Sequence, residues 1–417
     1  MKKIIINGGN TLSGTISING AKNSAVALLP ASVLCDESSN IYNVPNISDR
    51  DVLIEILEKL NCNVIKDEDA IKIDSSKVIN TRIPMELSKK MRASYYFMGS
   101  LLSRFKHVEI YFPGGCNIGK RPIDIHIKGF EALGAKVQIK GDLYTIDAEE
   151  LNGANMTLDF ASVGATINIM LAAVKAKGRT IIRNAAREAE IVNVATYLNN
   201  MGAKISGAGT SVIRIDGVEY LHKGMVEVIP DRIEAGTYII LGAMIGDNLK
   251  IENIIPEHID ALLSKLTDMK IKYILEENSV TISKCNDIRP TNLKTAVFPG
   301  FVTDMGQPMM VLLTQANGVS MFEETIYENR MGHVKYLNKL GANIKNGNTN
   351  AVIIGPSKFY GTEVEATDLR GGAAMVLAGL IAEGTTTITS IEHILRGYDN
   401  IIEKLRNVGA DIKLIDE

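Results

Sequence analysis

No stretch of this 417-residue sequence approaches the roughly 20 consecutive apolar residues that a membrane-spanning helix needs. Residues 1–7 are too short an apolar segment for a secretory signal and lack its cleavage site. Neither sign of charge dominates, since the formal net charge is −3. We therefore expect a cytoplasmic protein without nucleic-acid or membrane partners, in which any anion is bound by local clusters of Arg and Lys.

Cysteine is also scarce, and none of the four cysteines forms a C-x-x-C pair. A zinc site or a redox dithiol is therefore not expected. Cys35, Cys62 and Cys285 lie in or beside apolar segments and are expected to be ordinary thiols. Cys116 differs, because glycines and polar residues surround it.

The sequence does contain an internal repeat. A motif typical of a helix end followed by a strand recurs roughly every 70 residues. Its six copies are Leu60-Asn61-Cys62-Asn63-Val64, Leu133-Gly134-Ala135-Lys136-Val137, Met201-Gly202-Ala203-Lys204-Ile205, Leu266-Thr267-Asp268-Met269-Lys270-Ile271, Leu340-Gly341-Ala342-Asn343-Ile344 and Val408-Gly409-Ala410-Asp411-Ile412.

Each repeat also carries a nearly uncharged run, such as 164–173 and 371–380, which indicates a helix buried on all sides. The unit reads as buried helix, strand, more polar helix and two strands. Six units predict an α/β protein of two similar three-unit domains. The last unit lacks room for its final strand, so we expect the N-terminal segment to complete it. The predicted domains are 21–229, and 1–20 together with 230–417.

Polar residues recur where these helices should begin. Before the buried helices they are Lys22 with Asn23, Arg92, Ser162, Asp231, Asp304 and Arg370. At the more polar helices they are Arg50, Arg121, Glu188, His258, Arg330 and Arg396. Polar N-caps explain Asp and Ser, but a cation at a helix N-terminus opposes the macrodipole. A bound anion would make both interactions favourable, so the pattern predicts an anionic ligand.

The loop Pro113-Gly114-Gly115-Cys116-Asn117-Ile118-Gly119-Lys120-Arg121-Pro122 separates a predicted strand from a helix that we expect to begin at Pro122 or Ile123. Its glycines would allow it to cover a site. Lys120, Arg121 and the helix N-terminus should lower the pKa of the Cys116 thiol. Cys116 is thus a candidate nucleophile or proton donor, although a surface cysteine in a glycine turn remains an alternative.

These residues resemble the enolpyruvyl transferases, and within them the branch that acts on UDP-N-acetylglucosamine. The resemblance extends along the whole chain. Its matching motifs are Asn19-Gly20-Ala21-Lys22-Asn23-Ser24, Met91-Arg92-Ala93-Ser94, Phe112-Pro113-Gly114-Gly115-Cys116, Ile118-Gly119-Lys120-Arg121-Pro122, Pro230-Asp231-Arg232-Ile233-Glu234-Ala235-Gly236-Thr237, Thr303-Asp304-Met305, Glu328-Asn329-Arg330, Asp368-Leu369-Arg370 and Arg396-Gly397-Tyr398.

The resemblance implies two domains of three β-α-β-α-β-β units with the active site in the cleft between them. It implies transfer of the enolpyruvyl group of phosphoenolpyruvate to the 3′-hydroxyl of UDP-N-acetylglucosamine, with release of phosphate and without a metal or organic cofactor. That reaction is the first committed step of peptidoglycan synthesis. A monomer is expected.

The resemblance also implies the site residues. Catalysis would involve Cys116 as general acid, Asp304 as base, and the charges of Lys22 and Arg396. Phosphoenolpyruvate would be bound by Lys22, Arg92, Arg121, Arg370 and Arg396. The nucleotide sugar would be bound by Asn23, Arg92, Arg121, Pro122, Ile123, Asp124, Ser162, Val163, Gly164, Asp304 and Ile326.

One departure from the family pattern is Phe160, where relatives often carry a lysine that contacts the diphosphate. Two other functions stay open. One is the same-fold branch that acts on 3-phosphoshikimate, which lacks the Gly-Gly-Cys loop. The other is a non-catalytic paralogue that binds the nucleotide sugar.

The role of Cys116 predicts how two substitutions behave. Fosfomycin should alkylate Cys116 in the presence of UDP-N-acetylglucosamine and absence of phosphate, which intact-mass measurement would detect. Cys116→Asp should retain some turnover, because a carboxylic acid also donates a proton, but should escape alkylation. Cys116→Ser should nearly abolish turnover. An unmodified mass for the unsubstituted protein would contradict this assignment.

Overall fold

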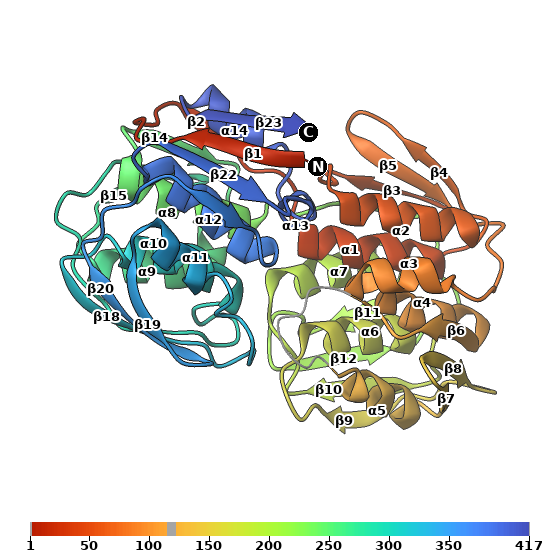
Figure 1. Ribbon diagram of the computed structural model, residues 1–417. Helices are drawn as coiled ribbons and strands as arrows, with labels where there is room; N and C mark the ends of the chain where they lie inside the picture. The colour runs from red at the N-terminus through yellow and green to blue at the C-terminus, as the bar shows by residue number, and fades with distance from the viewer. Residues whose placement is uncertain (1, 115–121, 417) are drawn as a thin grey trace. The chain divides into compact units, whose positions relative to one another are not determined.

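The computed structural model of the protein describes residues 2–114 and 122–416. The described chain forms two compact units, one of residues 20–114 with 122–229 and one of residues 2–19 with 230–416. We call these the first and the second unit. Each has its own hydrophobic core. Figure 1 shows the helices and strands of both units. Within the described ranges, no helix is long and apolar enough to cross a bilayer.

Three helices occupy the centre of each unit. In the first unit they are α1 (Lys22–Ala31), α4 (Tyr96–Phe105) and α6 (Val163–Ala173). In the second they are α8 (Arg232–Ile245), α10 (Gly306–Leu313) and α12 (Leu369–Ile381). Nearly all their residues are buried, as their uncharged sequences predict. α4 packs on α1 and α6, and α8, α10 and α12 pack on one another.

More polar helices lie between the strands of each unit. In the first unit they are α2 (Ser48–Lys59), α3 (Met85–Lys90), α5 (Asp124–Ala132) and α7 (Ala189–Asn200). In the second they are α9 (Asp260–Asp268), α11 (Val334–Leu340), α13 (Glu392–Leu395) and α14 (Ile401–Asn407). Short 3-10 turns are η1 (Ser32–Leu34), η2 (Arg92–Tyr95), η3 (Pro256–His258) and η4 (Thr303–Met305).

The strands of the first unit form three sheets around its helices. One sheet has the order β13 (Met225–Glu227), β3 (Ser38–Tyr42), β5 (Ala70–Asp74), β4 (Asn63–Lys66). The next has β6 (His107–Tyr111), β8 (Leu143–Asp147), β7 (Lys136–Lys140). The third has β11 (Lys204–Ser206), β12 (Val212–Asp216), β10 (Arg179–Arg183), β9 (Asn155–Thr157).

The second unit has three sheets of the same kind. One sheet has the order β15 (Tyr273–Leu275), β16 (Ser279–Ile282), β14 (Leu249–Glu252), β2 (Thr15–Ser17). The next has β17 (Leu293–Lys294), β18 (Gly318–Glu323), β20 (Asn350–Gly355), β19 (Asn343–Asn346). The third has β21 (Glu363–Glu365), β22 (Thr385–Thr389), β1 (Lys2–Asn7), β23 (Asp411–Asp416). The predicted six-unit α/β fold is confirmed.

The N-terminal segment takes part in two sheets of the second unit. β1 pairs antiparallel with both β22 and β23, so that Ile4 lies opposite Ile388 and Leu414. β1 thereby supplies the strand that the last repeat lacks. β2 pairs parallel with β14.

A buried amide joins two central helices of the first unit and gives a test of the fold. Asn168 of α6 accepts a hydrogen bond from the Gly99 amide at 2.8 Å and donates to the Tyr95 carbonyl at 2.9 Å. Asn168→Ala should lower the free energy of unfolding by about 2–4 kcal/mol, because it leaves both groups unpaired and opens a cavity.

Urea denaturation measures this change. The control is Asn200→Ala, which removes one exposed hydrogen bond to the Met225 carbonyl and should cost less than about 1 kcal/mol. Equal shifts of the two midpoints would contradict the prediction.

Candidate active site

In the second unit, one carboxylate lies against two buried arginines. Asp304 belongs to η4, directly before α10. Arg330 donates from Nη2 to Asp304 Oδ1 at 2.7 Å, and Arg370 donates from Nη2 to Oδ2 at 3.5 Å. The arginine side chains are 5% and 2% exposed, whereas that of Asp304 keeps 27% of its surface. The carboxylate is therefore accessible while the cations behind it are fixed.

The arginines decide the charge of Asp304. Burial alone would raise the pKa of its carboxyl group, but the charges of Arg330, Arg370 and the more distant Arg232 together hold that pKa well below its usual range. Asp304 is therefore ionised at neutral pH. With two guanidinium groups against it, it is also a weak base in this arrangement.

Arg370 has hydrogen-bonding capacity left over. It is the second residue of α12, whose N-cap Asp368 accepts hydrogen bonds from the Arg370 and Gly371 amides at 3.0 and 3.1 Å. Its guanidinium lies over the Tyr398 ring, 5.3 Å from the centroid. Nε and Nη1 have no hydrogen-bond partner in the part of the chain that the structure describes. These donors suit an anion.

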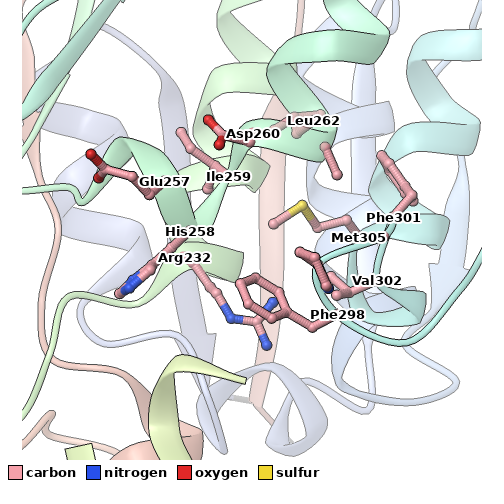
Figure 2. A pocket seen from close by; sticks show the side chains of 13 residues that line it. Arg232, Glu257, His258, Ile259, Asp260, Leu262, Phe298, Phe301, Val302 and Met305 are labelled. Atoms are coloured by element: carbon pink, nitrogen blue, oxygen red, sulfur yellow. The ribbon is translucent and has the colours of Figure 1, made fainter. Parts of the chain in front are cut away.

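A small pocket adjoins this cluster. It is lined by the start of α8, by η3 with the start of α9, and by the turn 298–302 that leads into η4. The Arg232 guanidinium lies over the Phe298 ring at 5.2 Å from the centroid, as Figure 2 shows from the pocket side. Met305, next to Asp304, forms part of the wall. The pocket shows that Arg232 is held beside the turn that carries Asp304.

In the first unit, the predicted residues at the start of α1 lie against acidic groups. Lys22 Nζ pairs with Asp49 Oδ2 of α2 at 2.9 Å. Asn23 donates from Nδ2 to Glu190 Oε1 of α7 at 3.5 Å. Protein carboxylates therefore already neutralise part of the positive charge from which the sequence predicted an anionic ligand.

A second group in the first unit surrounds an aromatic ring. The Arg92 guanidinium lies 5.8 Å from the Tyr95 ring centroid, and the His126 ring meets Tyr95 edge-on at 4.7 Å. Burial, with the charge of Arg92, lowers the pKa of His126 to about 3, so its imidazole is neutral. Gly164 lies close to the hydroxyl end of Tyr95 and to the His126 ring. Ser162 caps α6 by accepting from the Ala165 amide at 3.3 Å.

The remaining predicted site residues differ in how deeply they are buried. Pro122 and Asp124 are exposed, and Val163 and Ile326 are half-buried. Ile123 is 3% exposed, so its side chain belongs to the core. Phe160 is exposed, and its neighbour in sequence, Asp159, pairs with Lys128 at 2.6 Å. Cys116 and Arg121 lie outside the described residues.

Some expectations about helix starts are wrong. α5 begins at Asp124, with Ile123 as its N-cap. Arg396 is the C-cap of α13, where a cation is favourable. Arg330 precedes α11 by several residues. Arg50 lies in the first turn of α2, but its guanidinium is paired with Asp51 and Asn46. For these residues the macrodipole argument carries no information about a ligand.

The sequence argument missed several residues that shape the site. Arg330 stood in a recognised motif but was not assigned to the site. Asp49, Tyr95, His126 and Glu190 surround predicted residues of the first unit. They lie on helices whose apolar pattern explains the positions of the elements but not the contacts of individual polar side chains.

Comparison with known proteins fits this arrangement of helix starts. A sequence model of the EPSP synthase family, described as 3-phosphoshikimate 1-carboxyvinyltransferase, matches residues 6–405. The chain belongs to this family of enolpyruvyl transferases.

Relatives of this enolpyruvyl transferase cover its full length. A UDP-N-acetylglucosamine 1-carboxyvinyltransferase of Streptococcus pneumoniae (strain Hungary19A-6) is 51% identical over 100% of both chains. A UDP-N-acetylglucosamine 1-carboxyvinyltransferase 2 of Listeria monocytogenes is 51% identical over 98% of this chain and 97% of its own.

Two solved structures share the fold. The enolpyruvyl transferase NikO from Streptomyces tendae has a TM-score of 0.91 at 26% identity, over 99% of both chains. An EPSP synthase from Acinetobacter baumannii has a TM-score of 0.77 at 16% identity, over 100% of both chains, and shows the fold alone.

Gly164 provides a test of this transferase's packing. A Cβ at this position would lie 2.4 Å from the Tyr95 hydroxyl oxygen and 3.2 Å from His126 Cε1. Gly164→Ala should therefore lower the free energy of unfolding by about 1–3 kcal/mol, as overpacking typically does. Thermal and urea denaturation measure the loss.

The double variant Gly164→Ala with Tyr95→Phe should recover part of this stability, because the closest clashing atom is gone. Additive losses in the two single variants would contradict a steric origin at Tyr95.

Proposed function

We propose that this chain transfers the enolpyruvyl group of phosphoenolpyruvate to the 3′-hydroxyl of UDP-N-acetylglucosamine, with release of phosphate, in peptidoglycan synthesis. The observation that carries the proposal is the Asp304–Arg330–Arg370 cluster, in a chain whose full-length relatives bear the name of this activity. The cluster combines a proton acceptor with unused cationic donors, which are the two functions that the reaction requires.

Phosphoenolpyruvate brings a carboxylate and a phosphate close together, and Arg370 is suited to receive one of them. Its Nε and Nη1 donors need no rearrangement of the helix to reach an anion, because Asp368 already caps α12. Lys22, Arg92, Arg121 and Arg396 supply the further cations.

Asp304 accepts the proton of the sugar hydroxyl. While both arginines contact it, its low pKa makes it a poor base. An anionic substrate that engages Arg370 would withdraw one of the two charges and raise the basicity of Asp304. Binding of phosphoenolpyruvate therefore prepares the base for the hydroxyl.

The reaction is an addition followed by an elimination. The sugar oxygen forms a bond to C2 of phosphoenolpyruvate while C3 gains a proton, for which Cys116 is the donor. Phosphate then leaves C2, and loss of a proton from C3 restores the double bond. Lys22 and Arg396 stabilise charge that develops at the carboxyl-bearing carbon.

The nucleotide sugar is bound by Asn23, by the segment of Pro122 and Asp124, by the start of α6 at Ser162, Val163 and Gly164, and by Ile326. Ile123 contributes through its backbone, because its side chain is buried. Phe160 offers no charge to the diphosphate. The protein acts as a monomer in the cytoplasm, where both substrates are made.

A phosphate-release assay tests the proposal. With phosphoenolpyruvate present, UDP-N-acetylglucosamine should support phosphate release and shikimate 3-phosphate should not. Asp304→Asn should reduce turnover by about 10²- to 10⁴-fold, as loss of a general base does. Turnover with shikimate 3-phosphate would support the other branch, and binding of both substrates without turnover would identify a non-catalytic paralogue.

A further inference from the structure

Glu324 is a buried carboxylate that has no part in the reaction as described above. It follows β18 directly and is 4% exposed. A buried carboxylate is costly unless each oxygen accepts hydrogen bonds, so its contacts define its position closely.

Each oxygen of Glu324 is engaged. Oε1 accepts from the Thr295 hydroxyl at 3.1 Å and from the Ile326 and Tyr327 amides at 2.8 and 3.2 Å. Oε2 accepts from the Thr303 hydroxyl at 2.7 Å. One carboxylate thereby joins three segments: the end of β17, the start of η4 and the loop before Arg330.

The bond to Thr303 fixes the direction of that hydroxyl. A hydroxyl has one proton, and here it is donated to Glu324, which leaves the oxygen's lone pairs for other donors. Arg330 donates to the Thr303 oxygen from Nη1 at 2.5 Å and to Asp304 Oδ1 from Nη2 at 2.7 Å. Glu324, Thr303 and Arg330 therefore form a continuous chain of hydrogen bonds that ends on Asp304.

We propose that Glu324 is a positioning residue for the transfer reaction: through the Thr303 hydroxyl it holds the Arg330 guanidinium against Asp304. Glu324 touches no reacting atom. It also fixes the backbone of Ile326, a residue assigned to the nucleotide sugar. The proposal rests on the role of Asp304 as the base.

Three arginines lower the pKa of Asp304: Arg330 and Arg370, which contact it, and the more distant Arg232. If Arg330 moves away, that pKa rises. The base acts in its ionised form, so activity is lost as the pH falls through its pKa. A raised pKa therefore moves the acidic limb of the pH profile of kcat to higher pH.

Two substitutions break the chain at different links. Thr303→Val removes the hydroxyl at nearly constant shape and charge. Glu324→Gln keeps the shape, but its amide has one acceptor oxygen, so it cannot accept both from the Thr303 hydroxyl and from the donors that face Oε1. Each should lower kcat by about 10- to 100-fold, an effect of the size seen when a group that orients a metal ligand is removed. Each should also move the acidic limb upward, with little change in KM for phosphoenolpyruvate.

The sign of the pH shift separates positioning from a simple charge effect. Removing the negative charge of Glu324 without moving Arg330 would lower the pKa of Asp304 and move the limb downward. Thr303→Ser retains a hydroxyl and should restore kcat and the pH profile. If Glu324→Gln does not fold, Thr303→Val and Thr303→Ser still decide the question.

The matched control is Glu323→Gln. Glu323 is the neighbouring residue on the opposite, exposed face of β18, and it pairs with Lys294 at 2.9 Å. This variant should keep unchanged kcat and pH dependence. Wild-type kcat in Thr303→Val, or a loss without any shift of the acidic limb, would overturn the proposal. Wild-type turnover in Asp304→Asn would instead show that the assigned base is wrong.

Discussion

Two buried guanidinium groups share one carboxylate in this protein, and that imbalance of charge organises the second unit. Arg330 and Arg370 are almost inaccessible to water, so their desolvation must be offset by negative partners. Asp304 serves both and is kept ionised by them. Asp368 and Asp231 add further negative charge that acts on Arg330 and Arg370, respectively. Two donors of Arg370 still have no partner among the described residues. The same contact therefore fixes the charge of Asp304 and the position of the Arg370 guanidinium.

The first unit also contains cations that are partly shielded from water, and it stabilises them differently. Lys22 is paired with Asp49, and Arg92 lies over an aromatic ring beside a histidine that burial keeps neutral. A neutral imidazole adds no repulsion to Arg92. Cations of the two units therefore differ in how firmly protein groups already hold them. Lys22 already has a carboxylate partner in Asp49, whereas Nε and Nη1 of Arg370 have no partner among the described residues.

The sequence predicted the six-unit fold because burial leaves a periodic signal. Uncharged runs such as those of α6 and α12 mark central helices. The repeated motif that includes Leu133-Gly134-Ala135 marks helix ends. It did not reveal the edge strands β9, β13, β17 and β21, which have only two or three residues. Strands so short leave no alternating pattern to detect.

The site was predicted less completely, because contacts between residues without a regular spacing leave no periodic signal in the sequence. Asp304 and Arg370 were found because they recur at helix starts and match motifs. The contacts of Glu324 with Thr303 and of Thr303 with Arg330 join residues 21 and 27 positions apart. No repeat spaces them, and only the folded chain brings them together. Arg396 shows the converse, because a regular spacing suggested a helix start where the chain forms a helix end.

The repeated fold places different polar side chains at equivalent positions, the starts of the central helices. Each central helix needs its first amides satisfied, and a single side chain can do this locally, as Ser162, Asp231 and Asp368 do. Once the cap is provided, the neighbouring position is free to carry a cation such as Arg232 or Arg370. Capping is thus separated from ligand binding by one or two residues. A cationic group can therefore be placed at the start of a buried helix without unravelling its first turn, because the acidic cap offsets the charge that the macrodipole would oppose.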